Sequence, residues 1–299
     1  MPAFPFVLRS SFRAALFAGA LLLPVGLRAQ DTTSTANLRP TSGTRIVQLV
    51  LTDGSRLVGQ VIEVTPTTIR FASQFGETVI PRTVVAKVNE SDANASHQGE
   101  FWPEDPSRTR LFFAPTARML RQGEAYFADA YIFFPSMQYG ITDALSIGAG
   151  LSLIPGLGID RQLYYITPKL AVYSAPRAQF SVGALIAGGR LFDQNPFGIG
   201  YGVGTFGGED GSLTTGIGYG FSGGTTSSSA VLLLGGSQRV SRGLALVTEN
   251  YLFTGRNSTS LLSGGLRMMG EKLSVDFAAF VAPTTSTTIV PYVAFVYKF

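Results

Sequence analysis

The sequence predicts an all-β protein: a transmembrane antiparallel β-barrel of about 12 strands (10–14), preceded by a small soluble five-stranded barrel. Of the 299 residues, 45% are hydrophobic, 35 are Gly and only 14% are charged, whereas ordinary soluble domains carry roughly 25% charged residues. After the N-terminal region no apolar run reaches the ~18–20 residues of a membrane-spanning helix, so a helical membrane bundle is excluded. From residue 108 onward, alternating segments of a suitable length for membrane strands follow one another.

The N-terminus has the three parts of a cleaved secretory signal over residues 1–29. A basic region ends at Arg13, an apolar stretch covers residues 14–25, and a break at Pro24 and Gly26 leads to Ala29. The apolar stretch is too short to span a bilayer, and the alternative interpretation is a buried helix of the fold. We therefore expect export, followed by a flexible linker over the Thr/Ser-rich residues 30–44.

Charge and cysteine content exclude several classes of function. The formal charge is +4, but three of the 23 basic residues lie in the acid-free leader, and 20 basic residues then face 19 acidic ones. Such a balance gives no basis for a nucleic-acid partner. The chain has no Cys and a single His, His97, so disulfides, thiolate chemistry and ordinary metal sites are absent. We expect no cofactor and no metal.

Residues 45–90 predict a small β module. Five short strands are expected at 45–51, 56–64, 68–71, 78–80 and 84–88, with a tight turn at Asp53-Gly54. The runs LTDGSRLVGQVIEV and FGETVIPRTVVAKV resemble an Sm-like or SH3-like small barrel. The Sm family often binds RNA through loop residues, but those loop signatures are not clear here. The expected role is a periplasmic protein-interaction module, with a plain spacer as the alternative.

Residues 91–107 should form a polar connector, in which the Phe101-Trp102 pair could lie at a membrane interface. The region 108–299 then divides into twelve alternating segments. They are 108–117, 125–138, 145–154, 163–173, 179–189, 197–206, 212–221, 229–237, 244–253, 260–269, 273–281 and 288–299. The connections that would face outward, such as 155–162, 190–197 and 222–228, are short.

Two features separate a membrane barrel from a soluble β-sandwich. In residues 145–153, and again in 213–221, one face is apolar while the other carries Gly, Ser and Thr rather than Lys and Glu, which suits a confined lumen. The chain also ends with aromatic residues at every second position, Phe295, Tyr297 and Phe299. This ending resembles the C-terminal assembly signal of bacterial outer-membrane barrels. The resemblance implies an outer-membrane location, contact with outer-membrane lipid and with the barrel-assembly machinery, and an N-terminal domain in the periplasm.

Charged residues in the predicted strands should point into the lumen, because a charge on the lipid face costs about 2–4 kcal/mol at the bilayer midplane. This assigns seven side chains to the interior: Arg110, Asp129, Lys169, Glu249, Arg267, Asp276 and Lys298. One interpretation is a charged pore lining that selects ions. The other is a set of structural ion pairs filling a narrow lumen, since opposite signs alternate between neighbouring strands.

No motif predicts an enzyme. Residues 202–207 fit G-x-G-x-x-G and residues 220–224 fit G-x-S-x-G, but neither leads into a helix, as both motifs require. The only His lies outside the predicted barrel. The sequence therefore favours a narrow passive pore for small solutes or ions. The alternative is a non-conducting protein whose barrel anchors the periplasmic module.

Overall fold

The computed structural model describes residues 40, 45–92, 96–97, 100–190, 195–255, 258–283 and 288–299. The expected signal peptide and nearly all of the expected linker lie outside the described residues. No helix within the described ranges is long and apolar enough to cross a membrane.

The N-terminal module is a five-stranded antiparallel sheet, not the closed small barrel that the sequence predicts. Its strands are β1 (Arg45–Leu51), β2 (Arg56–Val64), β3 (Thr68–Ser73), β4 (Gly76–Pro81) and β5 (Val85–Asp92), in the order β4-β3-β2-β1-β5. A 3-10 turn at Arg82–Val84 separates β4 from β5, and no pairing joins these two edge strands. Buried Val47, Leu49, Ile69 and Phe71 form the core of the sheet.

The predicted hairpin turn between β1 and β2 is confirmed. Gly54 has φ 84°, which Gly adopts at little cost. The Ser55 backbone N–H donates to Asp53 Oδ1 at 2.8 Å. Hydrogen bonding to the Ser55 side chain, and then to this N–H, lowers the pKa of the Asp53 carboxyl. A short ladder of β6 (Ser96–His97) with β7 (Glu100–Phe101) follows.

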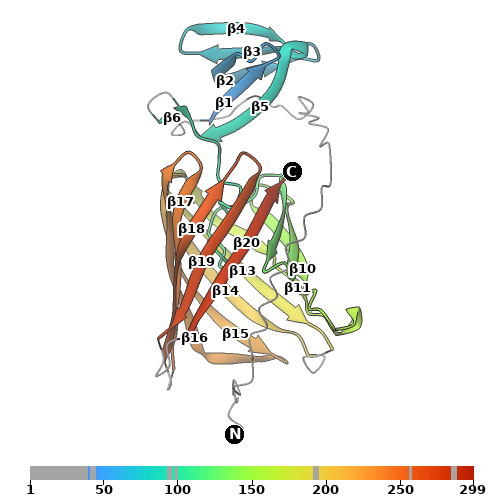
Figure 1. Ribbon diagram of the computed structural model, residues 1–299, viewed down its shortest axis with the longest axis vertical. Helices are drawn as coiled ribbons and strands as arrows, with labels where there is room; N and C mark the ends of the chain where they lie inside the picture. Colours follow the sequence, from blue (N-terminus) through green and yellow to red (C-terminus); the bar gives the residue numbers. More distant parts are fainter. Residues whose placement is uncertain are drawn as a thin grey trace. The chain divides into compact units, whose positions relative to one another are not determined.

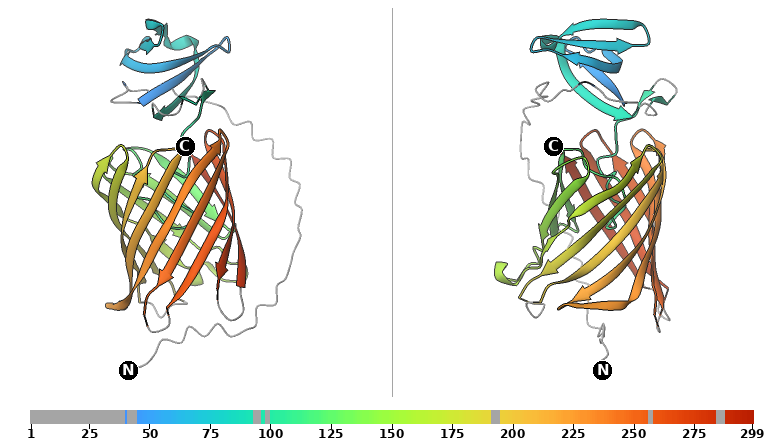
Figure 2. Two further views of the ribbon diagram at one scale, coloured as in Figure 1. Left: turned by 90° about the vertical axis from the view of Figure 1, so that its left-hand side faces the viewer. Right: turned by 180° about the vertical axis from the view of Figure 1, so that it is seen from behind.

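The second sheet closes into the predicted twelve-stranded antiparallel barrel (Figure 1). Its strands are β8 (Ala125–Ala130), β9 (Phe134–Gly140), β10 (Leu145–Leu151), β11 (Tyr164–Ile166), β12 (Lys169–Ala175), β13 (Ala178–Gly188), β14 (Phe197–Gly207), β15 (Gly211–Ser222), β16 (Thr225–Ser241), β17 (Leu244–Phe253), β18 (Thr259–Met269), β19 (Leu273–Ala282) and β20 (Thr288–Lys298). The short strands β11 and β12 share one position in the wall, because both pair with β10 and β13. Pairing of β20 with β8 closes the ring, and the strands run obliquely around it (Figure 2).

Two of the predicted segments differ from the structure. Segment 125–138 contains two strands, because the chain turns at Tyr131 and Ile132, which have φ 58° and 67°. Segment 108–117 is not a wall strand and contains only an isolated bridge between Arg110 and Pro115. One predicted strand is lost at 108–117 and one is gained within 125–138. The predicted number of strands is therefore confirmed, although the first predicted strand was wrong.

The barrel has two different ends. One end, called here the turn end, carries Phe299 and short turns such as 141–144, 176–177 and 242–243. The opposite loop end carries the connection 152–163, which includes a 3-10 turn at Ile159–Arg161. The outward faces of the strands are apolar: on β20, Val293 and Tyr297 are exposed while Tyr292, Ala294 and Val296 are buried. This alternation fits a wall surrounded by lipid.

Candidate functional site

The lumen holds residues 102–124, called here the inner segment. At the turn end, the Arg239 guanidinium lies 5.0 Å from the centroid of the Trp102 ring, and the Gly123 N–H donates to the Gly140 carbonyl at 2.8 Å. Between these points the chain extends toward the loop end, where the ring centroids of Phe113 and Tyr131 are 6.5 Å apart. The expected position of Trp102 at a membrane interface was therefore wrong, because its ring packs against an inward-facing arginine.

Glu249 of β17 fixes the tip of the inner segment. Its carboxylate is fully buried, and Oε2 accepts the backbone N–H groups of Phe112, Phe113 and Ala114 at 2.8, 2.9 and 2.9 Å. The Tyr251 hydroxyl donates to Oε1 at 2.7 Å. Hydrogen bonds to an ionised acceptor are roughly twice as strong as neutral ones. The Glu249 carboxylate therefore satisfies backbone N–H groups that, in a sheet, would donate to a neighbouring strand.

Arg267 of β18 is the second anchor, and it is only 1% exposed. Its Nε donates to Asp276 Oδ1 at 2.7 Å and its Nη1 to Asp105 Oδ2 at 2.8 Å. Nη2 donates to the Leu111 carbonyl at 2.5 Å. Two carboxylates around one guanidinium, with carbonyls on its remaining donors, satisfy a buried charge that would otherwise be very costly.

Further contacts join the inner segment to other parts of the wall. On β12, Lys169 Nζ donates to the carbonyls of Thr116 and Arg118 at 3.2 and 2.7 Å. On β14, Thr205 Oγ1 accepts the Ala117 N–H at 2.8 Å. The inner segment is therefore tied to the wall on several sides of the lumen.

At the turn end, Glu104 and Glu124 lie among three cations. Glu104 pairs with Arg108 at 2.9 Å, Arg121 at 2.8 Å and Lys298 at 2.8 Å, and Glu124 pairs with Arg108 and Lys298. Burial alone would raise the pKa of the Glu104 carboxyl, but the charges of Arg108, Lys298 and Arg121 outweigh it and hold the pKa well below its ordinary value.

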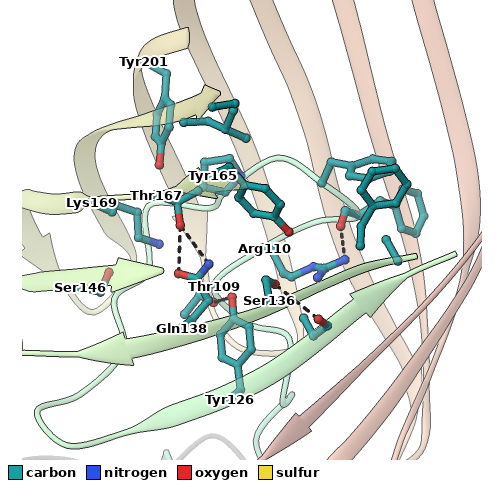
Figure 3. A pocket seen from close by; sticks show the side chains of 18 of the residues that line it. Thr109, Arg110, Tyr126, Ser136, Gln138, Ser146, Tyr165, Thr167, Lys169 and Tyr201 are labelled. Carbon is teal, nitrogen blue, oxygen red and sulfur yellow. Dashed lines mark hydrogen bonds between the residues drawn. The ribbon is translucent and has the colours of Figure 1, made fainter. Parts of the chain in front are cut away.

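A cavity of about 340 Å³ remains between the inner segment and the wall formed by β8 to β14. Figure 3 shows Lys169 beside the hydrogen-bonded pair Gln138 and Thr167, whereas the Arg110 guanidinium is directed away from them, toward the Phe112 carbonyl. The opposite side of the lumen is packed instead, with the Phe112 ring centroid 5.9 Å from that of Phe280 and 5.5 Å from that of Tyr292. The lumen is thus closed on one side and hollow on the other.

The seven predicted interior charges do not form one cluster. Lys169, Glu249, Arg267, Asp276 and Lys298 face inward, and Arg267 lies opposite Asp276 in the register of β18 and β19. Glu249 accepts hydrogen bonds from the backbone of the inner segment. It does not form the expected ion pair with Arg267. Arg110 lies on the inner segment instead of a first strand and donates to the Phe112 carbonyl and, at 2.8 Å, to the Tyr292 hydroxyl.

Asp129 differs from the expectation of a lumenal position. It lies opposite Phe295 in the β8–β20 register, on the face that Phe127 and Phe295 share with their rings 5.8 Å apart. Its Oδ1 accepts the Phe134 N–H at 3.2 Å across the turn. A carboxylate next to a turn is near the barrel rim, where a charge on the outer face costs far less than at the midplane.

Sequence reasoning missed the acidic partners Asp105, Glu104 and Glu124 and the inward-facing Arg239. Arg239 lies outside the predicted strands, because the predicted segment ends at residue 237. A signal for the inner segment was present: Arg108, Arg110, Arg118 and Arg121 fall within one short stretch. That density of charge suits contact with a polar lumen better than a strand facing lipid.

No protein-family model matches the chain, and no curated protein matches it in sequence. Solved structures similar to it include a KdgM porin, at 9% identity and TM-score 0.46 over 59% of this chain and 99% of that chain. A loop L8 deletion mutant of OmpT, an outer membrane protein of Vibrio cholerae, is similar at 10% identity and TM-score 0.34 over 86% and 97%. Salmonella typhi OmpF in complex with daunomycin is similar at 9% identity and TM-score 0.33 over 86% and 95%. At this level nothing follows beyond a β-barrel in each protein, and the barrel here is established by its own strand pairing.

Proposed function

We propose that this protein is an outer-membrane barrel that acts as a narrow passive pore for small solutes or ions, with its N-terminal sheet in the periplasm. The observation that carries the proposal is the cavity of about 340 Å³ beside the inner segment. Its lining includes Phe134, Ala187 and Phe197 next to the loop end, and Ser146 and Leu120 nearer the turn end. A hollow that follows the wall over this distance is the natural route for a solute through an otherwise filled lumen.

The test is conductance of the refolded protein in a planar bilayer, after a gel has shown different migration with and without boiling, as closed barrels do. We expect small discrete steps. Ala187→Phe, which places a ring in the cavity, should reduce the conductance several-fold. Ala184→Phe on the same strand, at an outward-facing position, is the matched control and should conduct as the parent protein does.

A second candidate function is a non-conducting anchor for the N-terminal sheet. The inner segment supports it, because residues 102–124 follow the module after a short connector and carry the buried contacts to Glu249 and Arg267. An anchor would give a folded barrel without conductance. Deletion of residues 45–90 would then remove the cellular phenotype while barrel assembly remained intact.

A further inference from the structure

We infer that the cavity between the inner segment and β8–β14 is a binding site for a small amphipathic carboxylate, with its anionic group at Lys169 and its apolar body toward the loop end. The inference deepens the proposed function and rests on it, because the passage proposed for solutes is also the way into this cavity. Three features of the lining carry it: its charge, its unused donors and its exposed apolar groups.

The charge of the lining has one sign. Arg110 and Lys169 are part of it, while Asp and Glu are absent from the described residues around the cavity. The carboxylates that neutralise cations elsewhere in the lumen lie outside this lining, where Asp276 and Asp105 bind Arg267. An anion entering the cavity therefore meets basic side chains and no Asp or Glu in the described lining itself.

Both cations have donors left for a ligand. Lys169 Nζ donates to two carbonyls, and an ammonium group has three donors. Arg110 Nε is buried without a hydrogen-bond partner in the described part of the chain. A buried donor without a partner costs about 1–3 kcal/mol, so an oxygen acceptor in this position would be stabilised. In Figure 3 the Lys169 side chain points into the cavity, beside Gln138 and Thr167.

The rest of the lining is apolar and incompletely covered. Leu185 alternates with outward-facing Val182 and Ala184 and faces the cavity, yet it is 37% exposed. Phe113, inside the lumen, is 52% exposed. Large apolar side chains that stay uncovered inside a barrel favour an apolar ligand, since burial contributes roughly 25 cal/mol per Å².

On the wall side of the cavity, large apolar side chains lie toward the loop end and Lys169 lies farther from it. Phe134, Leu163 and Phe197 begin or precede strands at the loop end, whereas Ser146 and Lys169 lie opposite one another deeper in the wall. Two glycines make room for rings in the lining: a Cβ on Gly150 would lie 2.4 Å from the Tyr165 hydroxyl, and one on Gly183 would lie 2.5 Å from that of Tyr201. The volume is at the small end of the ~300–1,000 Å³ of small-molecule sites, so the ligand is short.

The test compares three probes that share one ring and differ in their head group: 4-(trifluoromethyl)benzoate, the corresponding benzyl alcohol and the corresponding benzylamine. Binding to the full-length protein in lipid nanodiscs is followed by fluorine NMR, with empty nanodiscs as the reference. We expect saturable binding of the carboxylate, at least tenfold weaker binding of the alcohol and none of the amine above the empty discs. Equal binding of the carboxylate and the amine would overturn the inference.

Two pairs of variants locate the site. Ala187→Phe should abolish carboxylate binding while Ala184→Phe retains it. Lys169→Met should weaken binding about tenfold or more, while Lys272→Met, which removes an exposed lysine in the turn before β19, should leave it unchanged. If Lys169→Met fails to give a heat-modifiable barrel, the head-group series and the alanine pair still decide the question.

Failure of this inference is distinguishable from failure of the proposed function. Conductance without carboxylate binding would keep the pore and reject the binding site. Binding without conductance would reject the pore but keep a site of the stated chemistry. Unchanged binding in Ala187→Phe would show that the carboxylate binds elsewhere, and the inference would be wrong.

Discussion

Replacing Glu249 by Leu should release the tip of the inner segment. The substitution leaves the backbone N–H groups of Phe112, Phe113 and Ala114 without the acceptor that now holds all three. Each buried donor left without a partner costs about 1–3 kcal/mol. Because the tip can move toward the neighbouring cavity and recover some partners, we take the lower bound of about 3 kcal/mol for the three together.

Glu249→Gln is the matched comparison. The amide keeps one acceptor oxygen for the three N–H groups, and its nitrogen can donate to the Tyr251 hydroxyl. Only the assistance of the charge is lost, at about 1–2 kcal/mol in total. Asp160→Asn serves as the surface control, since Asp160 and Arg190 form an exposed pair, and such pairs contribute about 0–1 kcal/mol.

The assay is backbone hydrogen exchange, measured by mass spectrometry on peptides that cover residues 108–118. A loss of about 3 kcal/mol corresponds to exchange faster by roughly 150-fold, and we expect this for Glu249→Leu, with an increase of roughly tenfold for Glu249→Gln. Peptides from β18 and β19 should remain protected. Unchanged exchange at residues 112–114 in Glu249→Leu would refute the conclusion that this carboxylate holds the inner segment in place.

Three further predictions concern stability. Asp276→Asn leaves buried Arg267 with Asp105 as its remaining carboxylate partner, so the free energy of unfolding should decrease by about 2–3 kcal/mol. The gel band of the unboiled, folded barrel should then disappear at a lower temperature. An unchanged temperature would contradict the pairing. Because the folded-state pKa of Glu104 is lowered, its contribution to stability is present above the ordinary carboxyl pKa and is lost as the pH falls below it. The urea concentration at the unfolding midpoint should therefore decrease once the pH is lowered below about 4.5. In Glu104→Gln this midpoint should depend less on pH. Ile132 is 72% exposed with φ 67°, so Ile132→Asn should raise the free energy of unfolding by about 1 kcal/mol, and a lower value would show that the side chain has a packing role.

The barrel could be predicted from the sequence because membrane strands obey a strict rule of alternation, and the wall strands follow it. Alternation of apolar residues with Gly and Ser identifies strands such as β10 and β15, and the cost of charge in lipid identifies Lys169, Glu249, Arg267 and Asp276 as inward-facing. The same rule gave the wrong face for Asp129, because it applies at the midplane and weakens next to a turn.

The inner segment could not be predicted by that rule. Residues 108–117 contain apolar pairs that read as a strand, and only the position of the partners Glu249 and Arg267 shows that backbone groups are satisfied by side chains instead of a neighbouring strand. The turn at Tyr131 was hidden for a different reason: an aromatic and a β-branched residue occupy conformations that usually belong to Gly or Asn, so the sequence carries no turn signal there.

The path of the inner segment has a topological consequence. The chain enters the lumen near Trp102 and leaves it near Gly123, and both points lie at the turn end. The segment is therefore an inserted loop and not a thread, and no part of the chain must pass through the closed ring to place or remove it. The loop can enter the lumen either before or after β8 pairs with β20 to close the barrel. Pulling on the chain at Phe101 would extract the loop without breaking any strand pairing of the wall.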